Sequence, residues 1–575
     1  MVQYGGPRQT WSHEQKYAYF RLRELLSSNR WELYRPTVIG LSALVDEALT
    51  VLRIYGDEGH EHPKHILEEL TGRLNSVVFQ GSDYSQDVKY LSLLANTLKT
   101  INKPTNRDID PMLSALQAFK GKLKRSKTTK EIVFALRRLC AHNPNPAYHE
   151  IEELLVSLTN EIASDGFSAE FVTGWLGEHK FYTYGFEDYF SKLIRFLEAH
   201  PTEEFTCYFR LQVPEGWTPR NFEAYGIKIQ SYQPDQDQPI EFIKEGGWIA
   251  EVRVSCRDQF RALQEGRSLV KEVAGLFQIT NISANKTVSS RAYVGTPGVG
   301  SIIDGSIYKP SILQAQNLPR FLDVQAQEGA SWASSAVIRD AAYWFHGANE
   351  APNQHMRLIA LWTVLELLMD IRGGTIAERV LKYVPPFLKL YHVPVMVDFL
   401  QSEFTKSAIT IDGASVVEAA ASAEETLTTK VAFAKFIVEN HGVILPSLSN
   451  RDVLSRRLRS FVHLMENSQS LKEYFENYTS EVEYDLRRSF RYRNWLVHRV
   501  VVTSHTLDRT LDCLSYYVRT VINGILQALT TSPSLSVKDV LVSKYVTSQH
   551  YLDPCKDKRP IDVIEHIVDP KSLFI

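Results

Sequence analysis

The chain has 575 residues, of which 44% are hydrophobic and 23% charged, and its formal net charge is −3 at pH 7. This length exceeds what one hydrophobic core usually serves, so we expect three or four structural units at about 150 residues each. The near-neutral charge excludes an affinity for nucleic acid or membrane spread over the whole surface, so any basic site must be local.

Two further features bear on where the protein works. No apolar run approaches the roughly 20 residues that cross a bilayer, and the opening residues contain no apolar core of a secretory signal. The five cysteines are scattered without a Cys-x-x-Cys pair: Cys140, Cys207, Cys256, Cys513 and Cys555. An odd, dispersed set is typical of reduced core thiols, not of disulfides or a zinc site. We therefore expect a cytoplasmic protein without membrane contact.

Residues 1–199 form the first predicted unit, a helical region with a possible sensor or regulatory role. Apolar residues recur there at spacings of three and four, with Asn, Gly or Pro at the breaks. The basic segment at residues 120–131 falls between two predicted helices, and we interpret it as a solvated loop in preference to a nucleic-acid contact. The HEHPKH segment groups His60, His62 and His65. Pro63 interrupts it and no His-Glu-x-x-His spacing follows, so a surface loop is favoured over a metal site.

Residues 200–312 are predicted to form a small α+β domain. Alternating apolar residues indicate strands at residues 204–214, 226–232 and 246–256. Asp258 is a natural N-cap for the amphipathic helix that follows, and further strands extend through residue 296. The GTPGVGS segment that comes next lacks the Lys-Ser/Thr of a phosphate-binding loop and precedes no helix. It therefore indicates a turn between strands.

Residues 313–532 are predicted to form a helical bundle. The helix at residues 355–371 is apolar on nearly all sides and should lie at its centre. Residues 533–575 follow as a C-terminal extension, in which the valine-rich stretch at 537–548 indicates a short strand or two. The predicted fold class is therefore mostly α with a central α+β unit.

The bundle contains an unusual stretch, LRRSFRYRNWLVHRV at residues 486–500, with five arginines and one histidine. At about 100° per residue, one polar stripe of this helix contains Arg487, Arg491, Asn494 and His498. Composition alone indicates the solvated face of an amphipathic helix. The alternative is a site that cleaves a phosphodiester. Histidine exchanges protons near neutrality, and the arginine fork binds phosphate oxygens and neutralises growing charge.

The segment RNWLVH, which contains Arg493, Asn494 and His498, resembles the Arg-x4–6-His motif of the HEPN superfamily. An earlier helix, RLIALWTVLELLMD, resembles the first HEPN helix, with Glu366 where an acidic residue commonly sits. AERVLKYV, which contains Arg379, resembles the helix that follows. The order of these helices resembles the Apea-like branch found in bacterial abortive-infection proteins. The resemblance covers roughly residues 334–529, and the strand–Asp–helix unit ahead of it is similar to a module often found before such domains.

This resemblance implies a homodimeric, metal-independent endoribonuclease without a cofactor. His498 would take the proton from the RNA 2′-hydroxyl or protonate the leaving 5′-oxygen, Arg493 would hold the scissile phosphate, and Asn494 would orient one of them. Added charge along the RNA path would come from Arg487, Arg491 and Arg499, of which Arg491 is inferred from helical phase. Glu366 and Arg379 would support the site.

Two interpretations of function remain open from the sequence. In the first, the chain is a toxin or antiphage effector whose earlier parts sense an infection signal, a phage-derived trigger or a cognate inhibitor. In the second, it is a non-catalytic HEPN bundle that binds nucleotide or partner proteins as a scaffold or regulator. A metal-dependent nuclease built on HEHPKH is a third, weaker idea. The RNA target, whether tRNA, rRNA or mRNA, the trigger and the presence of an antitoxin are not determined by the sequence.

Overall fold

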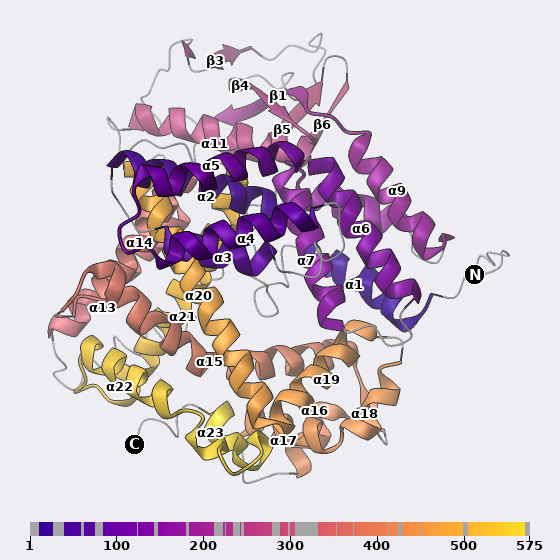
Figure 1. Cartoon of the computed structure of the whole chain (residues 1–575), viewed down its shortest axis with the longest axis vertical. Helices are drawn as coiled ribbons and strands as arrows, with labels where there is room; N and C mark the ends of the chain where they lie inside the picture. The colour runs from indigo at the N-terminus through magenta and orange to yellow at the C-terminus, as the bar shows by residue number, and fades with distance from the viewer. Residues whose placement is uncertain are drawn as a thin grey trace.

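The chain folds into many helices and one small sheet. The computed structural model describes residues 11–26, 40–58, 63–74, 84–123, 125–142, 148–179, 183–211, 222–224, 226–233, 242, 247–278, 288–296, 299–304, 332–351, 353–371, 373–411, 413–423, 428–449, 451–497 and 504–569. Within these residues the protein is mostly helical with a small antiparallel sheet (Figure 1), which confirms the predicted class of a mostly α chain with a central α+β unit.

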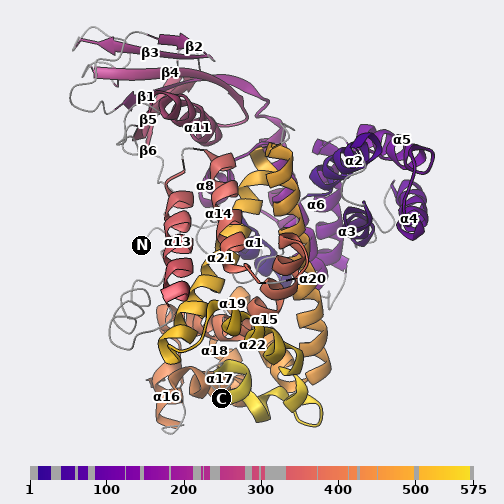
Figure 2. The same ribbon diagram turned by 90° about the vertical axis from the view of Figure 1, so that its left-hand side faces the viewer.

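The N-terminal region is helical throughout its described part. Its helices are α1 (His13–Leu26), α2 (Leu41–Glu58), α3 (Lys64–Leu74), α4 (Ser85–Thr100), α5 (Asn106–Lys122), α6 (Arg125–His142), α7 (Tyr148–Ser164), α8 (Ala169–Glu178) and α9 (Phe186–Glu198). Helix α5 begins at a capping box in which Thr105 and Asp108 satisfy each other's backbone N–H groups. These helices share one apolar core, built within residues 11–197. Helices α2 to α5 pack on one another and project from the side of the molecule (Figure 2), and we call them the α2–α5 lobe.

The basic segment at residues 120–131 differs from the predicted solvated loop. It forms the end of α5 and the start of α6. The Lys120 ammonium lies 2.6 Å from Asp46 of α2, and that of Lys122 lies 2.8 Å from Asp87 of α4. The two lysine side chains stay more than half exposed, and each pairs at the surface of the lobe with a carboxylate that a neighbouring helix supplies.

The α+β unit contains a six-stranded sheet of order β2-β3-β4-β1-β5-β6. Its elements are β1 (Glu203–Leu211), β2 (Phe222–Ala224), β3 (Ile227–Tyr232), β4 (Gly247–Cys256), α11 (Gln259–Gln278), β5 (Val288–Thr296) and β6 (Val299–Asp304). All pairs are antiparallel, and α11 covers one face of the sheet over a separate apolar core. The predicted N-cap is confirmed, because Asp258 accepts hydrogen bonds from the backbone N–H groups of Phe260 and Arg261, both at 2.9 Å. The same carboxylate also bonds Ser168 ahead of α8, which ties the sheet unit to the N-terminal helices.

The GTPGVGS segment joins two paired strands. Gly295 pairs with Gly300 and Thr296 with Val299, so its described residues belong to the antiparallel ladder between β5 and β6. The phenol of Tyr293 lies over Gly300, and a Cβ at position 300 would be 2.2 Å from the phenol oxygen. These pairs are the strand ends on either side of the predicted turn, and the residues of the turn itself, Pro297 and Gly298, lie outside the described residues.

The C-terminal bundle surrounds two adjoining apolar cores. Its elements are α13 (Trp332–Asn349), α14 (Gln354–Leu368), α15 (Ile376–Ser407), β7 (Thr410–Ile411), β8 (Ala414–Ser415), α16 (Val416–Ala423), α17 (Thr429–Glu439), α18 (His441–Ser447), α19 (Asp452–Glu466), α20 (Ser468–Val497) and α21 (Ser504–Thr531). Helix α14 lies at the centre as predicted, packed against α13, α20 and α21. Helix α15 runs uninterrupted through Pro385, Pro386 and Pro394.

The residues after the bundle are helical, and the predicted short strands are absent from their described part. Helix α22 (Val537–His550) is followed by η4 (Asp553–Cys555), η5 (Pro560–Val563) and α23 (Ile564–Val568). Helix α22 begins at a capping box made by Ser536 and Asp539, and it buries Val537, Val540 and Leu541 in the bundle core. A local cap and contact with α15 thus outweigh the strand preference of the valines. The extension is part of the bundle cores, not a trailing segment.

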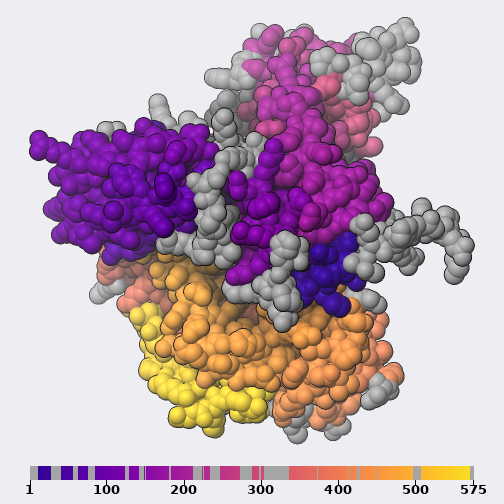
Figure 3. Space-filling model, turned by 45° about the vertical axis from the view of Figure 1, so that its right-hand side comes forward, coloured from indigo at the N-terminus to yellow at the C-terminus, as the bar shows by residue number. Residues whose placement is uncertain are grey.

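All five cysteines are buried and unpaired, as predicted. Figure 3 shows the indigo and purple N-terminal helices lying against the orange bundle. Helix α20 belongs to that contact and carries the candidate site residues Arg493 and Asn494.

Candidate functional site on helix α20

Helix α20 carries Arg493 and Asn494 in its last turn and packs between two bodies of the protein. Leu486 is fully buried in the bundle, and the Phe490 ring lies 5.4 Å from the Trp362 ring of α14. Trp495 is half-buried against both the bundle core and the N-terminal core. The polar side chains of α20 therefore face either the N-terminal helices or the boundary between α14 and α20.

Arg493 lies at the boundary between α14 and α20, beside an acid that the sequence pointed to. Its Nη2 is 3.5 Å from Oε1 of Glu366, and the Arg493 side chain is 33% exposed. Its Nη1 donates to Oδ1 of Asn494 at 3.2 Å, and Trp362 Nε1 donates to the same Glu366 oxygen at 3.0 Å. Half-exposed ion pairs of this kind contribute at most about 1 kcal/mol. Glu366 and Asn494 thus orient the guanidinium without holding it so tightly that an anion could not compete.

The other predicted residues lie in different surroundings. His498 and Arg499 lie outside the described residues, so their geometry toward Arg493 stays a prediction. Arg487 has a side chain 20% exposed and lies 4.0 Å from Glu483, one turn earlier on α20. Arg379 donates to the carbonyl oxygen of Ile371 and lies 3.9 Å from Asp370, so its contacts are with the connection between α14 and α15.

Arg491 differs from the predicted solvent-facing stripe. Its side chain is 5% exposed, and its Nε donates to Oε1 of Glu47 on α2 at 3.0 Å. Helical phase places Arg491 on the side of α20 predicted to face RNA, but α2 and α3 of the lobe cover that side. A residue's phase on its own helix does not tell which neighbour covers it, so the sequence could not reveal this contact.

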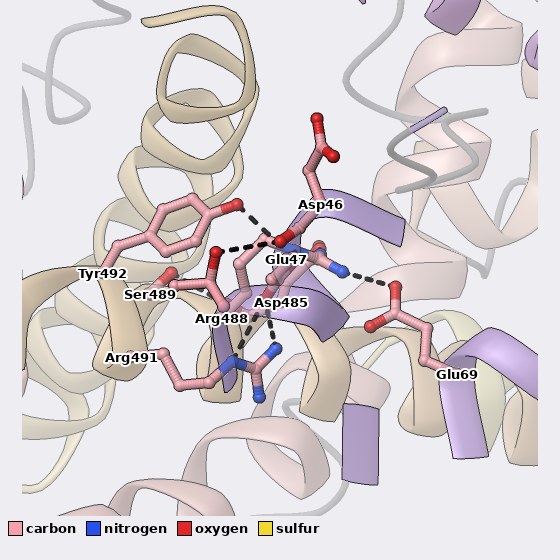
Figure 4. A network of polar contacts seen from close by, with 9 residues as sticks. Asp46, Glu47, Glu69, Asp485, Arg488, Ser489, Arg491 and Tyr492 are labelled. Atoms are coloured by element: carbon pink, nitrogen blue, oxygen red, sulfur yellow. Dashed lines mark hydrogen bonds and ion pairs between the residues drawn. The ribbon is translucent and has the colours of Figure 1, made fainter. Parts of the chain in front are cut away.

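Arg491 is part of a buried cluster of ion pairs, which we call the Arg488–Glu47 cluster. Arg488 is 1% exposed and donates through Nε to Oε2 of Glu47 at 2.9 Å, through Nη1 to Asp485 at 3.1 Å and through Nη2 to Glu69 of α3. Figure 4 shows these side chains converging from α20 on one side and from α2 and α3 on the other. The cluster is completed by Tyr517 of α21, whose hydroxyl donates to Asp485 at 2.7 Å, and by Tyr492, whose hydroxyl lies 3.5 Å from Glu47.

The charges of this cluster depend on one another. Burial alone favours the neutral form of every member. At Glu47 the charges of Arg488 and Arg491 outweigh burial, and the pKa of its carboxyl lies below the ordinary value. At Arg488, burial is likewise outweighed, chiefly by Glu69 and Glu47, and the pKa of the guanidinium is raised well above its ordinary value. Removing Arg488 would leave the Glu69 carboxylate buried without its arginine.

The sequence held one signal for this cluster. Glu47 and Glu69 each sit among apolar residues of their helices. Residues 44, 48 and 51 around Glu47 are buried leucine, alanine and valine, and residues 66 and 70 around Glu69 are buried isoleucine and leucine. A carboxylate within an apolar stripe must be paired with a cation, so the stripe indicates that a partner exists. It does not identify the partner.

Two further ionic junctions connect the bundle to the rest of the chain. Between α1 and α19, Glu24 binds Arg457, and Nδ1 of His13 lies 2.8 Å from Asp452. Between the sheet unit and the bundle, Nη1 of Arg261 lies 2.9 Å from Asp508, a residue in the first turns of α21. Helix α21 is the helix that follows the motif, so both earlier parts of the chain contact the two helices that flank residues 498–503.

Among the described residues, no group of three or more His, Cys, Asp or Glu side chains is placed to hold a metal ion. His60 and His62 of the HEHPKH segment lie outside these residues, and Nδ1 of His65 lies 3.1 Å from Glu68. No helix in the described part of the chain is both long enough and apolar enough to cross a membrane.

Comparisons of the chain with protein-family models, with curated proteins and with solved structures found no match. The likeness to HEPN domains therefore depends on the quoted motif residues and on the order of their helices. In the structure, Arg493 lies beside Glu366 of α14.

Proposed function

We propose that this chain is a metal-independent endoribonuclease of the HEPN type, acting as a toxin or antiphage abortive-infection effector. The observation that carries the proposal is the contact between Arg493 and Glu366. The motif arginine on α20 and the acid on α14 are 127 positions apart in the sequence and lie 3.5 Å apart, at a boundary where the guanidinium is one-third exposed. An arginine oriented in this way is suited to bind a phosphate that reaches the surface of the bundle.

The proposed reaction uses the nucleophile that RNA carries. His498 removes the proton from the 2′-hydroxyl, whose oxygen attacks the adjacent phosphorus, and the bond to the 5′-oxygen breaks. A protonated histidine, from this chain or from a second copy, returns a proton to the leaving oxygen. Arg493 neutralises the charge that grows on the phosphate oxygens, and Asn494 orients the phosphate or His498. The products end in a 2′,3′-cyclic phosphate and a 5′-hydroxyl, and the balance requires no metal or cofactor.

A homodimer would bring two motif helices to one cleft, so that each histidine works with its own arginine or with its partner's. Arg487 and Arg499 would add positive charge along the RNA. The N-terminal helices and the sheet unit, which contact α20 and α21, would respond to a phage-derived trigger or a cognate inhibitor. The chain devotes more residues to these parts than RNA cleavage needs.

The test is cleavage of a mixture of tRNA, rRNA and mRNA by the intact protein in EDTA. Cleavage that persists in EDTA and falls at least about a hundredfold in both Arg493→Ala and His498→Ala supports the proposal, since a positioned acid–base group contributes roughly that much or more. The matched control is Lys472→Ala, which removes an exposed cation from the same helix, its side chain 59% exposed and away from the motif. Loss of activity in EDTA would instead favour a metal-dependent nuclease.

Expression in growing cells provides a second test. The parent chain should arrest growth, alone or with phage present, and His498→Ala should not. If His498→Ala arrests growth as the parent does, or if well-folded protein cuts no RNA under any trigger, the non-catalytic scaffold becomes the better interpretation.

A further inference from the structure

The Arg488–Glu47 cluster has a feature that a purely structural ion pair does not need. Each oxygen of the Glu47 carboxylate is bound by a different arginine, Oε1 by Arg491 at 3.0 Å and Oε2 by Arg488 at 2.9 Å. Two guanidinium groups around two anionic oxygens form the arrangement in which arginines bind a phosphodiester. Glu47 thus occupies on α20 the place that one phosphate of a nucleic-acid strand would take.

The two arginines share a side of α20 with Asn494 of the proposed nuclease site. Arg493 lies two residues after Arg491, and Asn494 lies three residues after it. The three-residue spacing from Arg491 to Asn494 corresponds to a rise of about 4.5 Å and leaves the two side chains about 60° apart around the helix. Arg488 lies the same spacing before Arg491. Were α2 and α3 absent, Arg488 and Arg491 would form a cationic surface along α20 that leads to Asn494, whereas Arg493 lies about 160° round the helix from Arg491, on the side that faces α14.

The contact between the N-terminal helices and the bundle is of a kind that can separate. The core of residues 11–197 and the bundle cores are distinct, and among the described residues the bundle contributes only the half-buried Val453 and Trp495 to the N-terminal core. Across the contact, carboxylates of the N-terminal helices meet arginines of the bundle: Glu24, Glu47 and Glu69 against Arg457, Arg488 and Arg491. Polar contacts between domains of this kind permit relative motion more readily than a shared apolar core does.

We propose that Glu47, supported by Glu69, masks an RNA phosphate-binding pair formed by Arg488 and Arg491, and that release of α2 and α3 unmasks it. This inference rests on the proposed function, whose regulation it specifies. While the lobe is docked, the carboxylates compete with RNA for the same guanidinium groups, so the strand binds poorly along this side of α20. When a trigger displaces the lobe, both arginines become available to the RNA backbone.

The experiment compares two substitutions that break the same ion pair from opposite sides. Glu47→Gln and Arg491→Gln remove one charge each from the same buried contact, but only Glu47→Gln leaves both arginines for RNA. The probe is a fluorescein-labelled, 2′-O-methyl poly(U) strand, which lacks the nucleophilic hydroxyl and cannot be cut. Binding is measured by fluorescence anisotropy in EDTA. Asp46→Asn is the control, since Asp46 is adjacent on α2 and pairs with Lys120 at the surface of the lobe.

Glu47→Gln should bind the probe at least about tenfold more tightly than the parent, the gain expected from one charge-assisted contact to a phosphate. Arg491→Gln and Asp46→Asn should show no gain. Equal affinities in the two Gln variants, or no gain in Glu47→Gln, would overturn the masking inference and leave the cluster a structural contact. If circular dichroism shows that Glu47→Gln does not fold, Glu69→Gln, which keeps Glu47 in place, should still tighten binding at least about threefold, and its failure to do so is equally decisive.

The same proteins separate this inference from the nuclease proposal. Cleavage of unmodified RNA by the parent, with no gain of binding in Glu47→Gln, rejects masking and retains the nuclease. Tighter binding in Glu47→Gln without cleavage of unmodified RNA by any variant rejects the nuclease and retains a masked RNA-binding surface.

Discussion

Arg488 is the residue whose removal should disturb the molecule most. It is 1% exposed, and its three guanidinium nitrogens bind Glu47, Glu69 and Asp485. Arg488→Met keeps an unbranched apolar stem and deletes the guanidinium and its charge. Arg491 still compensates Glu47, but Glu69 and Asp485 remain buried without their cation. Breaking a buried ion pair from one side costs about 3–5 kcal/mol, because the remaining charge loses both water and its partner.

The cost should depend on pH in a defined direction. In the parent, the pKa of the Glu47 carboxyl is lowered, so its contribution to stability is present above its ordinary value of 4.5 and is lost as the pH falls through the folded pKa. In Arg488→Met, burial favours the protonated form of any carboxyl left without a cation. That penalty is full at neutral pH and is relieved as protons bind. The difference in stability between parent and variant should therefore shrink as the pH is lowered from about 7.5 to about 5.

The assay is thermal unfolding at both pH values, with hydrogen exchange of α2 and α3 as the local readout. Near pH 7.5 the melting temperature should fall by on the order of 10 °C, and the exchange of α2 and α3 should accelerate. Lys472→Met, a matched loss of an exposed cation from the same helix, should stay within about 0.5 kcal/mol of the parent. The reasoning is refuted if the two variants melt alike, or if the deficit of Arg488→Met grows toward acid pH.

Three smaller predictions concern other parts of the chain. His392 is buried, and burial lowers the pKa of its imidazole from 6.5 to about 3, so below about pH 6.5 only the unfolded state takes up a proton. Between about pH 7.5 and pH 5 this proton uptake lowers the free energy of unfolding by about 2 kcal/mol. The melting temperature of His392→Phe should therefore fall less over that interval than the melting temperature of the parent does. A Cβ at Gly524 would lie 2.7 Å from a phenylalanine ring of α15, so Gly524→Ala should lower stability by about 1–3 kcal/mol. A Cβ at Gly347 would have nothing within 4 Å, so Gly347→Ala should raise stability slightly. Melting temperatures in the reverse order would contradict this packing. Arg261→Ala removes the pair with Asp508 at 2.9 Å, so limited proteolysis should cut between the sheet unit and the bundle at least about threefold faster, and an unchanged rate would deny that pair a role in docking.

Features of the fold that are local in the sequence were predictable. The strands of the sheet unit alternate because successive side chains point to opposite faces. Asp258 caps its helix because its carboxylate reaches the backbone N–H groups two and three residues further on. The central position of α14 was predictable because its own side chains are apolar on nearly all sides of the helix. Local preference was insufficient at Val537, where a capping serine and contact with α15 select a helix for residues that favour strands.

In the candidate site, too, some features were predictable from the sequence and others were not. Arg493, Asn494 and Glu366 were identified from a motif and from the order of helices, and the contact between Arg493 and Glu366 is consistent with that order. The surroundings of Arg491 were not predictable, because its partner Glu47 is 444 residues away and on a helix of another core. Phase along one helix determines which side chains share a face, and it carries no information about what covers that face.

The sequence by itself determined the helical periodicity, the alternating strands, the caps and the concentration of arginine near the end of α20, because each depends on residues within a few positions of one another. Only the tertiary structure decided which arginines remain half-exposed and which are enclosed by carboxylates, because that depends on which distant helix packs on each side of α20. The physical reason is that a buried charge is stable only beside an opposite charge, and folding alone brings Glu47 and Glu69 to Arg488 and Arg491.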